Sequence, residues 1–197
     1  MTNTIIKTAG GMFSAAPASR LLQDREVHIF GTINAQTAEE TFELIRILEK
    51  ESRTEPIDVF IYSPGGELDA GMLVYDALVN CAAPVRTWCT GAACSVAALL
   101  VCAGKDGRYI FPHSRMLLHE PYASGEFCGL QADDLKRTAS RLTDERELLT
   151  DLLAKHTGRS KRIIRRAIAY DHFFNAEEAV KFGLADEICF APGRRGK

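Results

Sequence analysis

The sequence lacks the features that mark several common classes of protein. Its six cysteines include no C-x-x-C pair, the spacing typical of zinc sites and redox dithiols. Its longest apolar run, Val96 to Ala103, is much shorter than the ~20 residues of a membrane-spanning helix. Neither G-x-x-x-x-G-K nor G-x-G-x-x-G, two common phosphate-binding patterns, occurs in the chain. We therefore expect a soluble protein with no metal site and no cofactor of its own.

An excess of charge of one sign is also missing. The chain has 24 Lys and Arg residues against 26 Asp and Glu residues, a net charge of −2, which leaves no electrostatic footprint for nucleic acid. The one basic cluster is Arg194, Arg195 and Lys197 in a tail at 192–197, and such a cluster is typical of a solvated chain end. Neither nucleic acid nor a membrane is expected as a partner.

The cysteines lie mostly inside apolar stretches, and no segment at the start has the pattern of a secretory leader. We therefore expect reduced, buried cysteines and a cytoplasmic location rather than disulfides. The residues concerned are Cys81, Cys89, Cys94, Cys102, Cys128 and Cys189.

What the sequence does contain is an alternation of strands and helices over 197 residues, enough for one domain with a full core. Helical patterns include residues 68–80, the apolar segment after Ser95, and a short helix begun by Asn175 and closed by Gly183. The alternation predicts an α/β fold with a mostly parallel sheet. Strands are predicted at 26–32, 57–62, 85–89, 108–111, 115–119 and 185–189.

Two segments fall outside this alternation. Residues 1–19 are rich in small residues and lack periodicity, which predicts a flexible N-terminal arm. Residues 131–156 predict one long polar helix in which Leu135, Leu142 and Leu149 recur every seven residues. Because so narrow an apolar stripe cannot fill the core of its own domain, we expect this helix to project and to pack against a partner or a second copy.

Two predicted strand-to-helix turns are candidates for binding an anion or an oxyanion. "SPGGELD" (63–69) and "TGAACS" (90–95) each place glycine where backbone N–H groups open toward a ligand at the start of a helix. The alternative is that both are ordinary connections that happen to use glycine.

Ser95, at the end of the second turn, has two interpretations. As a helix N-cap it contributes roughly 1 kcal/mol by accepting a hydrogen bond from the backbone. As a nucleophile it needs a base, and His119 is the best placed of the five histidines because it ends an apolar strand. Asp171, flanked by aromatic residues, is a candidate to orient that imidazole, or simply a helix cap.

These segments together resemble the proteolytic subunit of the Clp peptidase (ClpP) family. The resemblance rests on four blocks in the family's order: "SRLLQDREVHIFGTI", "IYSPGGELDAGMLVYDAL", "TGAACSVAALLVCAGKDGRYIFPHSRMLLHEPYASG" and "DHFFNAEEAVKFGLADEI". It implies a ClpP/crotonase-type α/β fold of repeated β-β-α units over residues 20–191. It also implies a projecting handle at about 121–157, made of an extended segment and the long helix.

The resemblance also assigns roles at the site. It makes Ser95 the nucleophile, His119 the general base and Asp171 the acid that orients the base. Gly66 and Val96 would supply the oxyanion-hole N–H groups. The extended segment would pair with the substrate backbone through Gly125, Glu126 and Phe127.

The same resemblance implies how the protein works with others. Two seven-membered rings would stack through the handles to enclose a chamber, in which unfolded polypeptides are cleaved. A separate ATP-driven Clp-type AAA+ unfoldase would feed the chamber, so this chain would not hydrolyse ATP.

Some positions differ from the family's pattern. Tyr62 stands where the family usually has asparagine, and Ala169-Tyr170 stands where many members have an acidic-basic pair that links the rings. The N-terminal arm also differs from the family's axial loops. Three positions that tend to be apolar in the pockets for the unfoldase are polar here, namely Asp58, Asn80 and Thr90.

Two other functions stay open on the sequence. The chain could be a non-catalytic ring subunit that partners an active paralogue. It could instead be a crotonase-type acyl-CoA enzyme, which shares the fold and would use nearby carboxylates such as Glu67 and Glu120.

Overall fold

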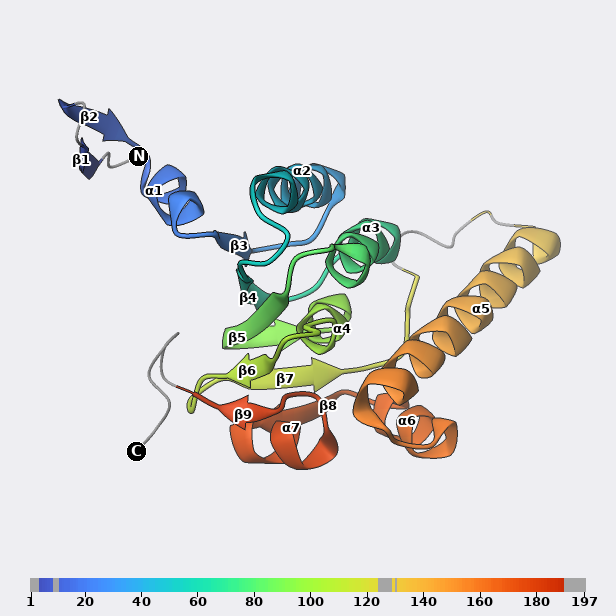
Figure 1. The fold of residues 1–197 in the computed structure, drawn as a ribbon. Coiled ribbons are helices and arrows are strands. Elements are labelled where there is room, and N and C mark those ends of the chain that lie inside the picture. The colour runs from blue at the N-terminus through green and yellow to red at the C-terminus, as the bar shows by residue number, and fades with distance from the viewer. Residues whose placement is uncertain (1–3, 9–10, 124–128, 130, 190–197) are drawn as a thin grey trace.

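Strands and helices alternate along most of the chain, as the sequence predicts. The computed structural model describes residues 4–8, 11–123, 129 and 131–189. The strands are β1 (Thr4–Thr8), β2 (Gly11–Ala15), β3 (Glu26–Phe30), β4 (Ile57–Ser63), β5 (Val85–Cys94), β6 (Arg108–Ile110), β7 (Arg115–Leu118), β8 (His172–Asn175) and β9 (Glu187–Ile188). The helices are α1 (Pro17–Gln23), α2 (Ala35–Glu51), α3 (Leu68–Asn80), α4 (Val96–Cys102), α5 (Ala132–Thr157), α6 (Lys161–Ile168) and α7 (Ala176–Phe182) (Figure 1).

The main sheet is mixed. Its order is β3-β4-β5-β6-β9, and β7 pairs with both β5 and β8. These neighbours are parallel except for β7 and β8, which are antiparallel. The predicted mixed α/β class is therefore confirmed, with a sheet that is mostly parallel.

Strand β5 is longer than predicted. The sequence analysis ended it at residue 89, before the Thr90-Gly91 pair, but the strand continues to Cys94. Gly91 adopts a φ of +77° inside the strand, and the pairing register with β4 shifts between Ile61 and Ser63. The irregularity lets β5 pair with β6 along its first half and with β7 along its second, so that its end reaches Ser95.

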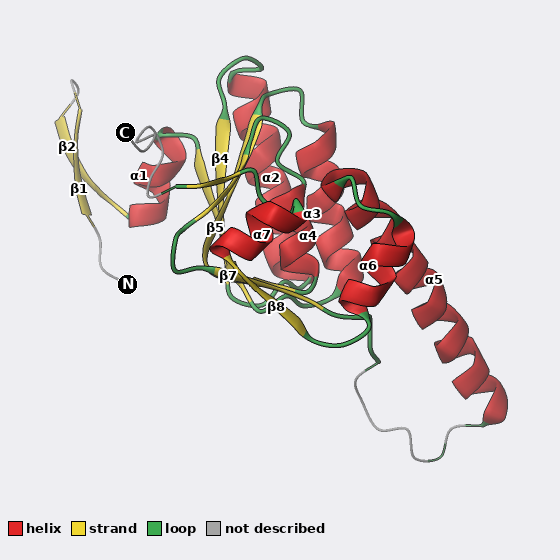
Figure 2. Cartoon of the chain, turned by 90° about the horizontal axis from the view of Figure 1, so that it is seen from below, coloured by secondary structure: helices red, strands yellow, loops and turns green. Residues whose placement is uncertain are grey.

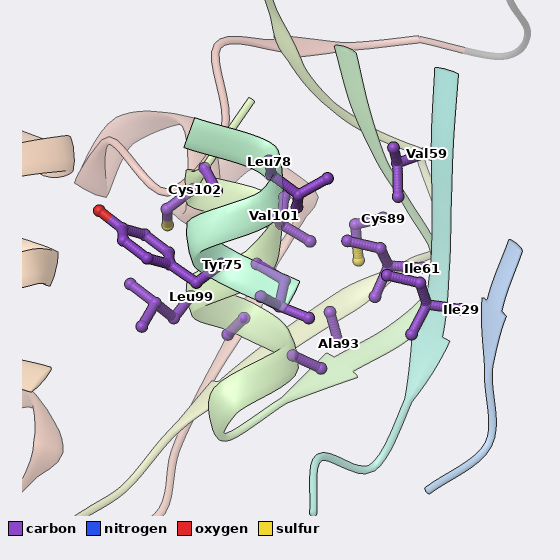
Figure 3. Close-up of a cluster of buried hydrophobic side chains, with 14 of the residues drawn as sticks. Ile29, Val59, Ile61, Tyr75, Leu78, Cys89, Ala93, Leu99, Val101 and Cys102 are labelled. Atoms are coloured by element: carbon purple, nitrogen blue, oxygen red, sulfur yellow. The ribbon is translucent and has the colours of Figure 1, made fainter. Parts of the chain in front are cut away.

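The two faces of the sheet differ in their side chains. On β4, Val59 and Ile61 point to one face and are fully buried, while Phe60 and Tyr62 point to the other. Helices α2, α3 and α4 lie together on the first side (Figure 2). The core there is aliphatic, built from residues of β3, β4 and β5 against α3 and α4 (Figure 3).

The other face is aromatic. Rings follow one another across neighbouring strands, with Phe60 stacked on Trp88 at 5.7 Å and Trp88 on Tyr109 at 4.2 Å between centroids. Phe30 and Tyr62, at 52% and 54% exposed, continue this face into solvent.

The three polar positions that differ from the family are all bonded within the chain. Buried Asp58 accepts hydrogen bonds from Arg86 Nε at 2.8 Å and from Trp88 Nε1 at 2.7 Å. Thr90 Oγ1 donates to the Ile61 carbonyl, and the Asn80 amide donates to the carbonyl one turn earlier in α3. Asp58 thus stabilises the aromatic face from inside rather than offering a free carboxylate.

Helix α5 matches the predicted long helix within a residue at each end and extends away from the rest of the fold (Figures 1 and 2). Thr150 and Leu153 are its buried residues, both near its C-terminal end, whereas Leu135 near its start is 46% exposed.

Residues 1–19, in which the sequence shows no periodicity, contain regular structure, because β1 and β2 pair as antiparallel strands. Gly125, Glu126 and Phe127 lie outside the described residues, as does the basic tail.

Candidate active site

A cavity of about 470 Å³ opens where β4 and β5 end. Its wall combines the turn after β4, the start of α4, the end of β7 and one side of α5. Four of the residues to which the resemblance assigns catalytic or oxyanion roles lie on this wall: Gly66, Ser95, Val96 and His119. In parallel sheets this carboxyl edge is where ligands generally bind.

Ser95 has a strained backbone. Its φ of +57° and ψ of −130° are far from the common conformations of a residue with a side chain, and such strain costs on the order of 1–3 kcal/mol. The strain is held by two backbone hydrogen bonds, from Ser95 N to Leu117 O at 2.8 Å and from Ala98 N to Ser95 O at 3.0 Å. Ser95 stands at the N-cap position of α4, but its side chain makes no capping hydrogen bond. The N-cap interpretation of its hydroxyl is therefore wrong.

Both glycines of the first turn are required by packing, Gly65 against Ser95 and Gly66 against Ile33. A Cβ on Gly65, where φ is +95°, would lie 2.7 Å from the Ser95 Cβ. A Cβ on Gly66 would lie 1.9 Å from the carbonyl oxygen of Ile33. Neither position has room for a side chain, and at Gly65 the missing Cβ lets the turn approach Ser95 closely.

The N–H groups of Gly66 and Val96 both belong to the cavity wall. Val96 is the first residue of α4, where an N–H has no acceptor inside its own helix. Within the described ranges, neither N–H donates to an acceptor of the protein. The pair is therefore free to bind an oxygen that carries negative charge.

His119 presents the nitrogen that a general base needs. Its Nδ1 lies 2.6 Å from the carbonyl oxygen of Glu120. Because a carbonyl oxygen can only accept, this contact assigns a proton to Nδ1, and the lone pair of the neutral ring is then on Nε2. The ring is half-buried beside Tyr122, with 5.5 Å between ring centroids.

Asp171 lies across the strand ladder from His119. Strands β7 and β8 pair Leu118 with His172, so the antiparallel register places Asp171 opposite His119 one step beyond the ladder. Asp171 is exposed, and the structure shows no hydrogen bond between its carboxylate and His119 in the part of the chain it describes. The structure thus brings Ser95, His119, Gly66 and Val96 to one cavity and leaves Asp171 beside it.

A comparison with known families agrees with this arrangement. The family model described as Clp protease matches residues 9–192. The chain belongs to the Clp protease family. Proteins of this family are serine peptidases, and the matched range contains Ser95, His119 and Asp171.

Membership of the Clp family leaves little support for the acyl-CoA alternative. Glu67 lies on the cavity wall, but Glu120 does not, and the Glu120 carboxylate lies 3.9 Å from Arg146.

No group of His, Cys, Asp or Glu side chains in the described ranges is arranged to hold a metal ion. Nor does any described helix have the length and apolar character to cross a membrane.

Burial shifts the pKa of two titratable side chains, Cys94 and His156. Burial raises the pKa of the Cys94 thiol, next to Ser95, and so disfavours its thiolate, although the charge of Arg115 opposes the shift. Burial, with the charges of Lys155 and Arg108, lowers the pKa of His156 to about 4. His156 Nε2 lies 2.8 Å from Tyr75 Oη and connects α5 to α3.

The sequence analysis missed the part of α5 that faces the cavity. Arg141, Glu145, Leu149 and Leu153 line it at intervals of four residues. Only the seven-residue leucine stripe was noticed in this helix. Four-residue spacing marks one helix face, but the sequence does not show which face meets the cavity.

Proposed function

We propose that the chain is a catalytically active proteolytic subunit of a Clp protease that cleaves peptide bonds with Ser95. The observation that carries the proposal is the strained serine on the cavity wall, with an imidazole and two unpaired N–H groups on the same wall. Strain of this kind at a non-glycine residue persists where the surroundings enforce it, and it gathers at functional sites.

The mechanism follows from these groups. His119 Nε2 takes the Ser95 proton as the hydroxyl oxygen attacks a peptide carbonyl, and the N–H groups of Gly66 and Val96 bind the oxyanion. The imidazolium then gives its proton to the leaving amine, which leaves an acyl-enzyme. A water molecule hydrolyses the acyl-enzyme by the same route in reverse.

Asp171 completes the triad in this proposal by a small rearrangement. The His119 imidazole has to break its hydrogen bond to the Glu120 carbonyl and donate from Nδ1 to the Asp171 carboxylate across the strand ladder instead. A carboxylate there would stabilise the imidazolium more strongly than a carbonyl does.

We further propose the family's assembly for this chain. Stacked seven-membered rings would enclose the cavities, with α5 and the segment before it as the handle between rings. An AAA+ unfoldase would supply unfolded polypeptides. The free cysteines fit a reducing compartment such as the cytoplasm.

Peptide hydrolysis tests the proposal. The purified oligomer, with and without an unfoldase, is given an unstructured protein and internally quenched peptides. We expect hydrolysis that falls about 10⁴-fold or more in Ser95→Ala, and that persists in Ser140→Ala, which removes an exposed hydroxyl of α5. Equal activity of both variants would contradict the assignment of Ser95.

One observation favours a second candidate, a non-catalytic subunit of a mixed ring. The His119 imidazole is bonded to Glu120 rather than to Asp171. If this arrangement persists in the assembled ring, the homo-oligomer would cleave nothing, and adding an active paralogue would restore hydrolysis that Ser95→Ala does not reduce.

A further inference from the structure

The cavity changes in character along α5. Leu149 and Leu153 face it from the C-terminal part of the helix, and Leu99 of α4 faces it from the core. Glu145 and Arg141 face it from the preceding two turns. With a rise of 1.5 Å per residue, Glu145 lies about 6 Å farther along the helix than Leu149. The cavity therefore has an apolar end and a charged end, one helical turn apart.

The wall of the cavity as a whole carries more acid than base. Glu67 and Asp69, at the start of α3, add two carboxylates to that of Glu145, against the single guanidinium of Arg141. Arg141 Nη1 lies 3.5 Å from Glu145 Oε1, an ion pair that makes no hydrogen bond in the described residues. One ion pair therefore leaves two of the three carboxylates without a cation on the cavity wall.

Exposure shows which partner of this ion pair can be displaced. The Glu145 side chain is 21% exposed, whereas that of Arg141 is 65% exposed. An exposed pair of this kind contributes little, so the Arg141 head can move into water at small cost. The Glu145 carboxylate, held against the wall, would then be open to a cation from another molecule.

We propose that the site selects a lysine or arginine at the residue whose carbonyl Ser95 attacks. The methylene stem of such a side chain would pack on Leu149 and Leu99, and its cationic end would reach Glu145, a turn away. The acidic wall formed with Glu67 and Asp69 would add attraction. The inference rests on the proposed peptidase function and deepens it by naming the substrate class.

The experiment compares peptides that differ only at that residue. Internally quenched peptides carry lysine, arginine, glutamine or leucine there, and kcat/KM is measured for the native oligomer. The test variant is Glu145→Gln, which keeps the shape and removes the charge. The matched control is Asp144→Asn, which makes the same charge change one residue earlier, at an exposed position off the cavity wall.

We expect lysine and arginine to exceed glutamine by about tenfold or more, the ratio typical of a charge-assisted hydrogen bond. Glu145→Gln should lower the lysine-to-leucine ratio by about tenfold, and Asp144→Asn should lower it by less than twofold. Arg141→Gln should raise the ratio, because it removes the competing cation.

Other results would overturn the inference in distinguishable ways. If leucine or glutamine peptides are cleaved as well as lysine peptides, or if the ratio does not move in Glu145→Gln, the specificity is wrong and the peptidase function stands. If no peptide is cleaved and Ser95 reacts with no serine-directed reagent, the proposed function fails and the specificity fails with it.

Discussion

Strands β4 and β5 build two very different regions within a few residues of each other. Along their length, Ile61 and its neighbours are packed under α3 and α4 in a mainly aliphatic cluster (Figure 3). At their ends, Gly66 and Ser95 belong to the wall of the cavity, and both have positive φ values. The first region is unstrained and closed, whereas the second is strained and open.

The difference shows that the residues that stabilise this fold are separate from those that form the proposed catalytic site. Apolar burial along the strands supplies the free energy that holds the unfavourable backbone of Ser95 in place. Substitutions should therefore separate the two properties. Substitutions on the packed face should lower the free energy of unfolding and leave Ser95 reactive. Substitutions at the cavity should lower the reactivity of Ser95 and leave the stability unchanged, unless they alter the backbone.

The largest effect is expected where the two regions meet. Gly66→Ala places a Cβ 1.9 Å from the Ile33 carbonyl oxygen, so the turn has to move. We expect the free energy of unfolding to fall by about 3 kcal/mol or more, together with loss of Ser95 reactivity. Denaturant unfolding and labelling of the same preparation measure both. A variant as stable and reactive as the native chain would show that the turn is not tightly packed.

A smaller effect on stability alone is expected on the packed face. Ile61→Ala removes a fully buried side chain of β4 and should lower the free energy of unfolding by about 3 kcal/mol. Below the unfolding transition, Ser95 should react at nearly the native rate. Reactivity that falls in proportion to stability would break the distinction between the two regions.

His156 gives the smallest effect, one that depends on pH. Its pKa is about 4 in the folded chain and near 6.5 when unfolded, so only the unfolded state takes up the proton between these values. Its contribution is complete above pH 6.5 and is lost as pH falls toward 4. With allowance for partial exposure, this amounts to about 1–2 kcal/mol.

Unfolding curves at pH 7 and pH 4.5 test this point with the variant His156→Gln. The native chain should lose about 1–2 kcal/mol more than the variant on acidification. An equal loss in both proteins would mean that His156 titrates normally.

The sequence predicted the elements better than it predicted their ends and contacts. Helix α3 was predicted with its observed bounds because an apolar face and a glycine-rich start mark it clearly. Strand β5 was cut short at Gly91, because a glycine that permits an irregular pairing looks the same in sequence as one that ends a strand. The β1–β2 hairpin gave no pattern at all.

At the site, the sequence located the turns but not the conformations. Ser95, Gly66, Val96 and His119 were found from turn chemistry and the family's motifs, and they share one cavity. The positive φ of Ser95 is held by tertiary contacts, and neither it nor the bond between the neighbouring residues His119 and Glu120 is marked by a pattern in the sequence.

The most direct test of the account is covalent labelling of the native protein with a fluorophosphonate, followed by mass spectrometry of its peptides. The account predicts one adduct on Ser95, unchanged in Cys94→Ala and absent in Ser95→Ala. An adduct on another residue, or labelling that persists in Ser95→Ala, would contradict the claim that this strained serine is the nucleophile.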